Sequence, residues 1–178
     1  MDNLIVITGG PGSGKTTLID ALSAAGYART MEAGRAVIKE QLEAGGDALP
    51  WDNQLAFAEK MMERDLQAYE AARAQPAVTF FDRGLPDVIG YLQLSGLPVP
   101  EHMTKAAQTL RYRQEVFIAP PWREIYVQDT ERKQDFAEAQ RTYEAMVAAY
   151  TALGYALVQL PCARVEERVT FIVERIRG

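Results

Sequence analysis

The glycine-rich segment VITGGPGSGKTT at positions 6–17 limits the possible folds of this chain more than any other part of it. It fits the pattern G-x-x-x-x-G-K-[ST] at every fixed position, from Gly9 to Thr16. An apolar, β-branched run precedes the segment and a helical pattern follows it, which is the context of a phosphate-binding loop, or P-loop. A complete match in this context disfavours the alternative, a glycine-rich turn that merely joins a strand to a helix. The segment therefore predicts that the chain binds a nucleotide.

The residue types in this loop suit the binding of nucleotide phosphates. Glycines let backbone N–H groups turn inward on phosphate oxygens, and the N-terminus of the following helix adds the positive end of its dipole. Lys15 is expected to reach the β- and γ-phosphates, and the Thr16 hydroxyl is expected to bind Mg²⁺. The predicted nucleotide-binding residues are Gly9, Gly10, Pro11, Gly12, Ser13, Gly14, Lys15, Thr16 and Thr17.

The rest of the chain alternates between strand-like and helix-like segments. Short apolar runs predict strands at 4–7, 27–30, 77–82, 116–118, 124–127 and 155–160. Helical periodicity predicts helices at 16–25, 33–44, 52–74, 86–94, 101–112 and 164–177, and a long helix that follows the charged residues 129–135 and ends at 152. This alternation is typical of an α/β fold with a mostly parallel sheet. No repeat or linker interrupts residues 1–178, so a single domain is expected.

Composition and charge exclude several classes of partner. The net charge is −5, whereas broad nucleic-acid binding needs a basic face. With one cysteine and one histidine, a disulfide framework is excluded and a structural zinc site is disfavoured, and Cys162 is expected to be a small packed residue. No stretch is long and apolar enough to span a bilayer, and the first residues lack the features of a signal peptide. We expect a cytoplasmic monomer or homodimer, with no nucleic-acid or membrane partner.

Two charged residues, Asp82 and Arg83, stand at the end of a predicted buried strand and precede Gly84. The carboxyl ends of parallel strands form the edge where ligands bind in open α/β folds. An acid there can hold Mg²⁺ or its water, and an arginine can bind phosphate. We therefore favour a metal role for Asp82 and a phosphate contact for Arg83 over an ion pair that only covers the strand end.

Glu32 and Arg35 follow the predicted second strand, and their i, i+3 spacing places them on one face near a helix start. In one interpretation, Glu32 is the base for an acceptor hydroxyl and Arg35 anchors the acceptor. In the other, Glu32 is a helix-start glutamate favoured by the helix dipole, and Arg35 is solvated. The residues alone leave both interpretations open.

The charged segment DTERKQD at 129–135 also has two interpretations. It is either a lid that closes Arg132 onto the transferring phosphate and excludes water, or a solvated helix start. Lys133 and Arg141 are weaker candidates for the same role.

The P-loop, the strand end and the charged segment are arranged as in P-loop nucleoside and nucleotide kinases, which the chain resembles. A closer likeness is to the AAA domain family of small predicted ATPases of the AAA_28 type, grouped with the kinase domains of NadR-like proteins. This likeness rests on FFDRGLPDVIGYLQLSG at 80–96, VFIAPPWREIYVQDTER at 116–132 and YTALGYALVQLPCARVEERVTFI at 150–172. The resemblance extends over nearly the whole chain.

The resemblance implies a three-layer P-loop fold with a five-stranded, mostly parallel sheet of the nucleoside/nucleotide-kinase type. It also implies ATP with Mg²⁺, and phosphoryl transfer or hydrolysis. In the kinases that the chain resembles, the first strand-end acid serves the acceptor and the second serves Mg²⁺, which implies these roles for Glu32 and Asp82. The resulting catalytic candidates are Lys15, Asp82, Arg83, Glu32 and Arg132, and the acceptor-binding candidates are Glu32, Arg35 and Arg83. Segment 45–51 is the only candidate for an acceptor-binding insertion.

Two other P-loop classes fit less well. A GTPase switch should carry an Asn-Lys-x-Asp tetrapeptide, and none occurs. An AAA+ motor usually needs a second helical domain, for which 178 residues leave no room. We therefore expect a kinase that transfers the γ-phosphoryl of Mg-ATP to an unidentified nucleoside, nucleotide or similar small molecule. The alternative that stays open is a slow ATPase that acts as a nucleotide-dependent regulatory protein without an acceptor.

Overall fold

The structure, a computed structural model, describes residues 2–122 and 130–178, and of residues 130–135 it describes the backbone alone. In this part of the chain, five strands form one parallel sheet in the order β2-β3-β1-β4-β5. The strands are β1 (Leu4–Gly9), β2 (Ala28–Arg29), β3 (Thr79–Asp82), β4 (Glu115–Ala119) and β5 (Ala156–Gln159). The predicted α/β fold with a five-stranded sheet is confirmed.

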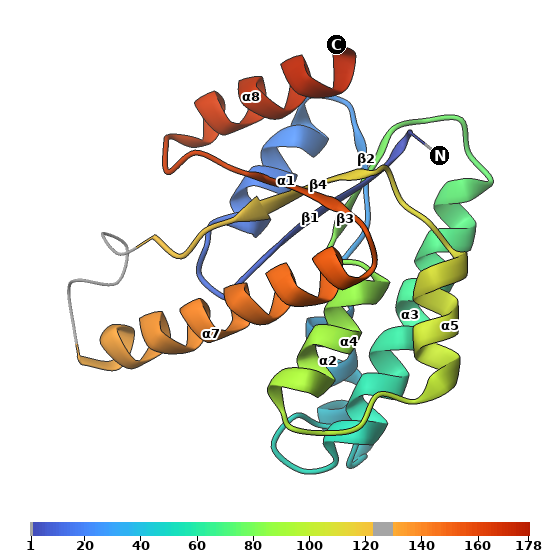
Figure 1. Ribbon diagram of the computed structural model, residues 1–178. Helices are drawn as coiled ribbons and strands as arrows, with labels where there is room; N and C mark the ends of the chain where they lie inside the picture. The colour runs from blue at the N-terminus through green and yellow to red at the C-terminus, as the bar shows by residue number, and fades with distance from the viewer. Residues whose placement is uncertain (1, 123–129) are drawn as a thin grey trace.

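Helices cover both faces of this sheet, which gives the molecule three layers (Figure 1). One face carries α1 (Lys15–Ala24) and α8 (Val165–Arg177), which pack against each other. The other face carries the remaining helices of the described residues, α2 (Ala33–Ala44), α3 (Gln54–Arg73), α4 (Leu85–Leu94), α5 (Glu101–Thr109) and α7 (Thr130–Ala152). Of the described helices, none combines the length and the apolar content that crossing a bilayer requires.

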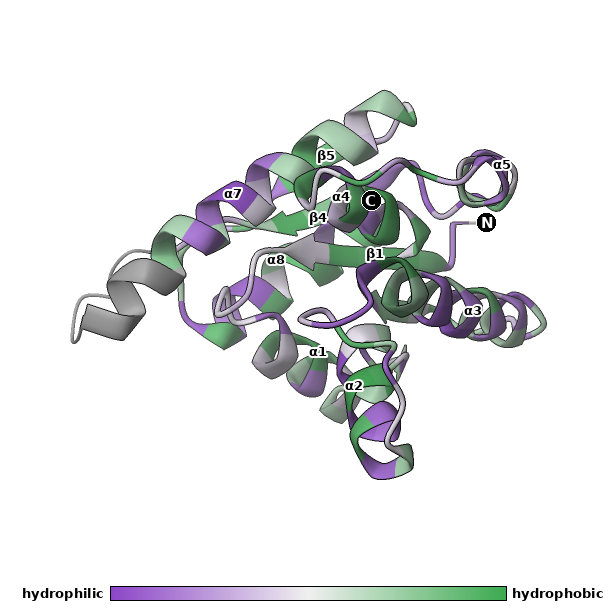
Figure 2. Ribbon diagram, turned by 90° about the horizontal axis from the view of Figure 1, so that it is seen from below, coloured by the Kyte–Doolittle hydropathy of each residue, from purple (hydrophilic) through white to green (hydrophobic). Residues whose placement is uncertain are grey.

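Strand β1 is buried on both faces, as its continuous apolar run predicts. Ile5 and Ile7 pack with Leu18 in the layer of α1 and α8. Leu4 and Val6 point to the opposite layer. Figure 2 shows β1 as hydrophobic over most of its length, with a paler arrowhead at its end. The strand that leads into the P-loop is therefore held from both sides.

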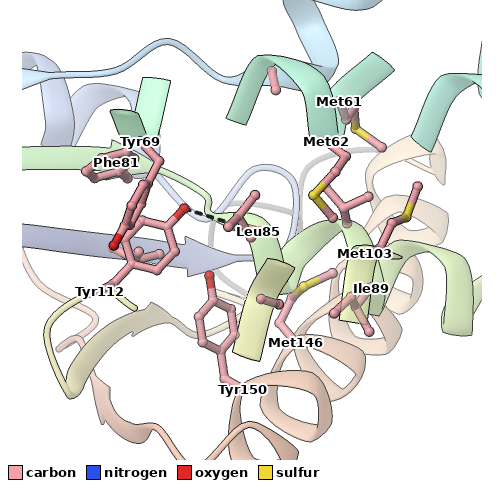
Figure 3. Packing of buried hydrophobic residues seen from close by; sticks show 14 of the residues in the cluster. Met61, Met62, Tyr69, Phe81, Leu85, Ile89, Met103, Tyr112, Met146 and Tyr150 are labelled. Carbon is pink, nitrogen blue, oxygen red and sulfur yellow. Dashed lines mark hydrogen bonds between the residues drawn. The ribbon is translucent and has the colours of Figure 1, made fainter. Parts of the chain in front are cut away.

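The larger apolar cluster lies between the sheet and the helices α3, α4 and α7 (Figure 3). Tyr112 packs edge-on against Tyr69 and Phe81, with ring centroids 5.3 and 5.0 Å apart. Its hydroxyl oxygen accepts a hydrogen bond from the backbone N–H of Leu85 at 3.2 Å. This contact fixes the start of α4, the helix that follows the candidate strand end Asp82-Arg83.

The register of the central strands assembles the site. Leu4 pairs with Thr79 and Ile7 pairs with Asp82 in the parallel ladder between β1 and β3. Because β1 ends at Gly9, the P-loop emerges beside the end of β3. Two segments that lie far apart in the sequence thus meet at the carboxyl edge of the sheet.

Three local expectations differ from the structure. The prediction that residues 130–135 precede the long helix is wrong, because α7 already begins at Thr130, consistent with the helix-forming tendency of Glu, Arg and Lys. The predicted strand at 124–127 lies outside the described residues. Cys162 is exposed rather than packed, because it lies in the turn between β5 and α8.

Candidate functional site

The start of the P-loop is pressed between β4 and α7, which explains its two consecutive glycines. Gly9 has a φ of +139°, and a Cβ at this position would lie 2.5 Å from the carbonyl oxygen of Ala119. A Cβ on Gly10 would lie 2.5 Å from the carbonyl oxygen of Ala139 in α7. Both approaches are too close for any side chain, so the glycines let the loop pass between the two elements.

Lys15, the charged residue of the loop, is buried, with 6% of its surface exposed. Its Nζ donates a weak hydrogen bond to the carbonyl oxygen of Gly10 at 3.4 Å. Burial, helped by the nearby charge of Arg83, lowers the pKa of Lys15 from 10.5 to about 8, although Asp82 and Glu32 act in the opposite direction. An anion that enters the loop would offset this loss of solvation.

Arg168 in α8 also holds the P-loop, and sequence reasoning missed this residue. Arg168 Nη1 donates to the carbonyl oxygen of Ser13 at 3.1 Å, and the Ser13 hydroxyl donates to that of Gly10 at 2.8 Å. Arg168 is 4% exposed, and burial lowers its pKa. The available signal was its position between Val165 and Ile172, on the apolar stripe of an amphipathic helix.

Asp82 ends β3 beside the loop and is 5% exposed. Its backbone N–H donates to the Thr30 hydroxyl at 3.3 Å, but its buried Oδ1 has no hydrogen-bond partner among the described residues. Burial raises the pKa of Asp82, while the charge of Lys15 lowers it. A buried carboxylate oxygen without a partner suits a Mg²⁺ ion, which takes one or two carboxylates and fills its other positions with water and phosphate oxygens.

No group of three or more His, Cys, Asp or Glu side chains forms a metal-binding cluster in the described part of the chain. Mg²⁺ does not require such a cluster when a nucleotide supplies oxygen ligands. Thr16 follows Lys15 in the first turn of α1, at the same end of the sheet as Asp82. These two residues are the ones that fit the predicted metal.

Arg83 connects the strand end to three other parts of the site. Its Nη1 donates to the carbonyl oxygen of Gly9 at 2.8 Å and to Asp87 Oδ1 at 3.3 Å, and its Nε lies 3.6 Å from Glu32 Oε1. Burial alone would lower the pKa of Arg83, but the carboxylates of Asp87, Glu32 and Asp82 together raise it. Arg83 also has a φ of 70°, in the left-handed region. The predicted phosphate contact would therefore be made by a guanidinium that already has partners within the protein, namely Gly9, Asp87 and Glu32.

Glu32 is the N-cap residue of α2 and is brought to the P-loop by its ion pair with Arg83. Its other oxygen, Oε2, lies 3.3 Å from Arg35 Nε, so the expected i, i+3 pair is present. The Glu32 side chain is 18% exposed, whereas that of Arg35 is 72% exposed. Glu32 is thus part of the enclosed site, and Arg35 lies at its solvent-facing rim.

Asp87 in the first turn of α4 is a central acid that sequence reasoning missed. One of its oxygens, Oδ2, accepts from the backbone N–H of Gly84 at 2.9 Å and from the Tyr150 hydroxyl at 2.5 Å. Its Oδ1 accepts from Arg83 and from the buried hydroxyl of Thr8. The signal was an acid at the third position of a helix that directly follows a charged strand end. Asp87 ties β1, β3, α4 and α7 together at one point.

A cavity of about 680 Å³ opens beside this network, between α2, α3, α4 and α7. Glu32, Arg83 and Asp87 line its polar side. Its other walls are largely apolar and include Ile38, Phe57, Met61, Val88, Tyr91 and Met146. Of the predicted insertion at 45–51, only Pro50 contributes to the wall, so helices form most of this cavity.

The predicted lid arginines come from α7. Arg132 lies in the first turn of this helix, and its side chain lies outside the described residues. Arg141, two residues after the contact of Ala139 with the P-loop, is exposed and lines the cavity. The described part of α7 thus runs from the P-loop along the cavity.

A family model described as an AAA domain matches residues 4–168. The chain belongs to this AAA domain family. The match confirms the expected membership and includes the P-loop, both strand-end acids and the cavity helices. A search of the curated proteins finds no match for this AAA domain chain.

The solved structures similar to this AAA domain protein include two kinases and a NadR protein. A thymidylate kinase from Ehrlichia chaffeensis is 15% identical, with a TM-score of 0.62 and 97% of each chain covered. A deoxyadenosine kinase from M. mycoides, solved with bound dATP, is 12% identical, with a TM-score of 0.64 and 98% of each chain covered. A NadR protein in complex with NR is 17% identical, with a TM-score of 0.68; the match includes 98% of this chain but 49% of NadR. The fold is thus that of P-loop nucleoside and nucleotide kinases.

Proposed function

We propose that this protein is a kinase that transfers the γ-phosphoryl group of Mg-ATP to a small molecule held in the 680 Å³ cavity. The observation that carries this proposal is the position of the cavity, whose wall includes Pro11 of the P-loop as well as Glu32 and Arg83. A molecule in the cavity would therefore lie next to the phosphates of a bound nucleotide. We further propose that residues 1–178 act as one kinase-like domain.

On the donor side, the loop from Gly9 to Thr17 binds the phosphates through the backbone N–H groups of its residues other than Pro11, which has none. Lys15 contacts the β- and γ-phosphates, and its lowered pKa rises again when the anion arrives. Arg168 keeps the loop in shape through its hydrogen bond to the carbonyl oxygen of Ser13. Arg132 closes onto the γ-phosphoryl from the start of α7, as the lid interpretation requires.

The residues that would hold Mg²⁺ are Thr16, through its hydroxyl, and Asp82, through the buried oxygen that has no partner in the described part of the chain. When bound, the ion neutralises charge on the phosphate oxygens during transfer. Asp82 then contributes a fixed carboxylate whose charged form the metal stabilises.

On the acceptor side, Glu32 takes the proton of the attacking hydroxyl as the new O–P bond forms and the bond from the γ-phosphorus to ADP breaks. Arg83 keeps Glu32 beside the loop through their ion pair, and Arg35 contacts the acceptor from the rim. The similar kinases are named for thymidylate and deoxyadenosine, which makes nucleosides and nucleotides the first compounds to test. The apolar walls with Phe57 and Tyr91 suit a flat ring.

A ³¹P NMR screen tests this proposal. Protein, Mg-ATP and a panel of nucleosides, nucleotides and other small hydroxyl compounds, with and without an amine, are incubated, and the γ-phosphoryl signal is followed into either a new ester or inorganic phosphate. We expect a new ester with at least one acceptor, and no product with Lys15→Ala, which removes the phosphate contact from a folded protein. A panel in which ATP yields only inorganic phosphate would favour the slow regulatory ATPase instead.

A further inference from the structure

One carboxyl group in the cavity has no role in the proposed transfer. Asp65 lies in α3, is 6% exposed and lines the cavity. It follows Phe57 and Met61, which also line the cavity, at successive intervals of four residues, so all three lie on one face of the helix. An acid therefore continues an apolar stripe into the cavity.

Two other acids of the cavity wall, Glu32 and Asp87, already have partners in the protein. Glu32 pairs with Arg35 and Arg83, and Asp87 pairs with Arg83 and accepts three further hydrogen bonds. Asp65, in contrast, makes no hydrogen bond and no ion pair with any residue between 2–122 and 130–178 whose side chain is described. Burial raises the pKa of Asp65 well above its usual range, the charges of Asp87, Asp82 and Glu32 act in the same direction, and Arg83 acts against them.

A buried carboxyl group that serves only the fold would be expected to have a partner inside the protein, because burying it alone is unfavourable. The free side of Asp65 faces the cavity, where a ligand is the available partner. Hydrogen-bonding groups of a bound molecule would replace the water that this carboxyl loses, and a positive charge would do so most effectively.

We propose that Asp65 is a specificity-determining residue and that the cavity selects a small hydroxyl compound with a protonated basic nitrogen, which pairs with Asp65. This inference rests on the proposed function, because it describes the acceptor of the same reaction. The nitrogen binds at α3, while the hydroxyl group lies toward Glu32 and the P-loop. Phe57 and Tyr91, whose ring centroids lie 5.5 Å apart in an edge-on contact, belong to the apolar wall of the same cavity.

The test uses matched pairs of compounds that differ by an ammonium in place of a hydroxyl group. The pairs are serinol with glycerol, glucosamine with glucose, and 2-amino-1-phenylethanol with 1-phenylethane-1,2-diol. Binding to the full chain in the presence of Mg-ADP is measured by saturation-transfer NMR and calorimetry. In at least one pair, we expect the amine to bind about ten- to a hundredfold more tightly than its partner, the effect of one charged hydrogen-bonded contact.

Asp65→Asn should reduce this preference to about onefold, because the amide keeps the shape of the side chain but loses the charge that strengthens its contact with an ammonium. Glu138→Gln is the matched control, since Glu138 also lines the cavity but is exposed at its rim, and it should keep the preference. A wild-type protein without an amine preference in any pair would overturn the proposal. So would a preference that Asp65→Asn retains.

A second measurement separates a ligand contact from a structural role. Because Asp65 has no partner in the described part of the ligand-free protein, Asp65→Asn and Asp65→Ser should melt at the wild-type temperature or above it. A lower melting temperature for both variants, or their failure to fold, would overturn the proposal. ADP binding by the same samples reports on the P-loop alone, so wild-type protein that binds ADP without preferring amines would reject this inference and leave the proposed kinase function standing.

Discussion

Arg83 Nη1 donates a hydrogen bond to the carbonyl oxygen of Gly9 across 2.8 Å, so the end of β3 is tied to the first residue of the P-loop. The same guanidinium contacts Asp87 and lies within ion-pair distance of Glu32. The structure therefore favours a positioning role for Arg83, in addition to the phosphate contact predicted from its place at a strand end.

Replacement of Arg83 by alanine and by glycine separates its backbone from its side chain. Both variants lose the contacts with Gly9, Glu32 and Asp87, and we expect each to unfold about 1–3 kcal/mol more easily and to bind ATP more weakly. Because Arg83 has a φ of 70°, the glycine variant should be more stable than the alanine variant by about 1 kcal/mol. Urea titrations measure both effects, and equal stabilities would contradict the backbone argument.

Lys15→Met should stabilise the nucleotide-free protein at neutral pH while it removes ATP binding. Burial lowers the pKa of Lys15 from 10.5 to about 8, which corresponds to about 3 kcal/mol of unfavourable interaction when the amine is charged. Between about pH 8 and pH 10.5 the unfolded chain binds this proton and the folded chain does not, so the wild-type free energy of unfolding rises with pH. Urea titrations should therefore show that the methionine variant exceeds the wild type in free energy of unfolding by less at pH 10.5 than at pH 7.

The control for this prediction is Lys39→Met in α2, since Lys39 is exposed. It should have little effect on stability at either pH and none on ATP binding. A Lys15→Met variant that is less stable than the wild type at pH 7 would mean that the amine has a compensating partner in the free protein.

Asp82→Asn should impair every phosphoryl transfer, including slow hydrolysis, because Mg²⁺ loses its proposed carboxylate. We expect the rate to fall about a hundredfold or more, in line with several kcal/mol of lost charge stabilisation. Since burial raises the pKa of Asp82, the folded state disfavours its ionised form, and the free protein should lose stability as pH rises from the usual aspartate range to this raised pKa. The variant should lack that pH-dependent loss.

Rates at increasing Mg²⁺ concentration and urea titrations across acidic pH measure the two effects of Asp82→Asn. Asp52→Asn, at an exposed position before α3, is the matched control and should behave as the wild type does. Wild-type turnover by Asp82→Asn would remove the metal role.

Glu32→Gln distinguishes a kinase from a plain ATPase. Transfer to a hydroxyl acceptor needs the carboxylate as a base, whereas background hydrolysis does not need the acceptor site. We expect acceptor phosphorylation to be abolished and most of the hydrolysis to be retained, with Arg35→Ala mainly raising the KM for the acceptor. Product analysis by ³¹P NMR measures both reactions, and hydrolysis as in the wild type with no acceptor found would support the regulatory ATPase.

Arg132→Ala tests the lid at the start of α7. If Arg132 stabilises charge on the γ-phosphoryl, its loss should lower kcat by about ten- to a thousandfold and change ATP affinity less. Arg141→Ala, farther along the same helix and on the cavity wall, should affect the acceptor KM instead. A preserved kcat with weaker ATP binding in Arg132→Ala would indicate a simple binding contact.

The sequence predicts the elements that carry strong local patterns. The P-loop and the buried strands β1 and β3 could be predicted because glycine spacing and continuous apolar runs are local properties of the sequence. The prediction that Glu32 and Asp82 lie at the same edge of the sheet followed from the parallel arrangement of the strands. The start of α7 was misplaced, because a charged helix turn and a charged loop have similar compositions.

The residues that sequence reasoning missed interact over long distances in the chain. Asp87 is linked to Tyr150 and Arg168 to Ser13, and no local pattern records which distant group each side chain meets. Asp65 was missed for a different reason, since the acid sits in a helix whose apolar periodicity alone suggested core packing. A charged residue on an apolar stripe is the shared signal that would have identified Arg168 and Asp65.

The pairing of β1 has a consequence for how the protein is made. Leu4 pairs with Thr79 and Ile7 pairs with Phe117, so the strand before the P-loop meets partners that leave the ribosome much later. Closing such long loops slows folding, and the apolar strand lacks its native neighbours during translation. The loop is synthesised before β4 and α7, yet it takes its shape only when both press against it. Nucleotide affinity should therefore report the completion of folding, and a nascent chain that stops before α7 should not bind ATP.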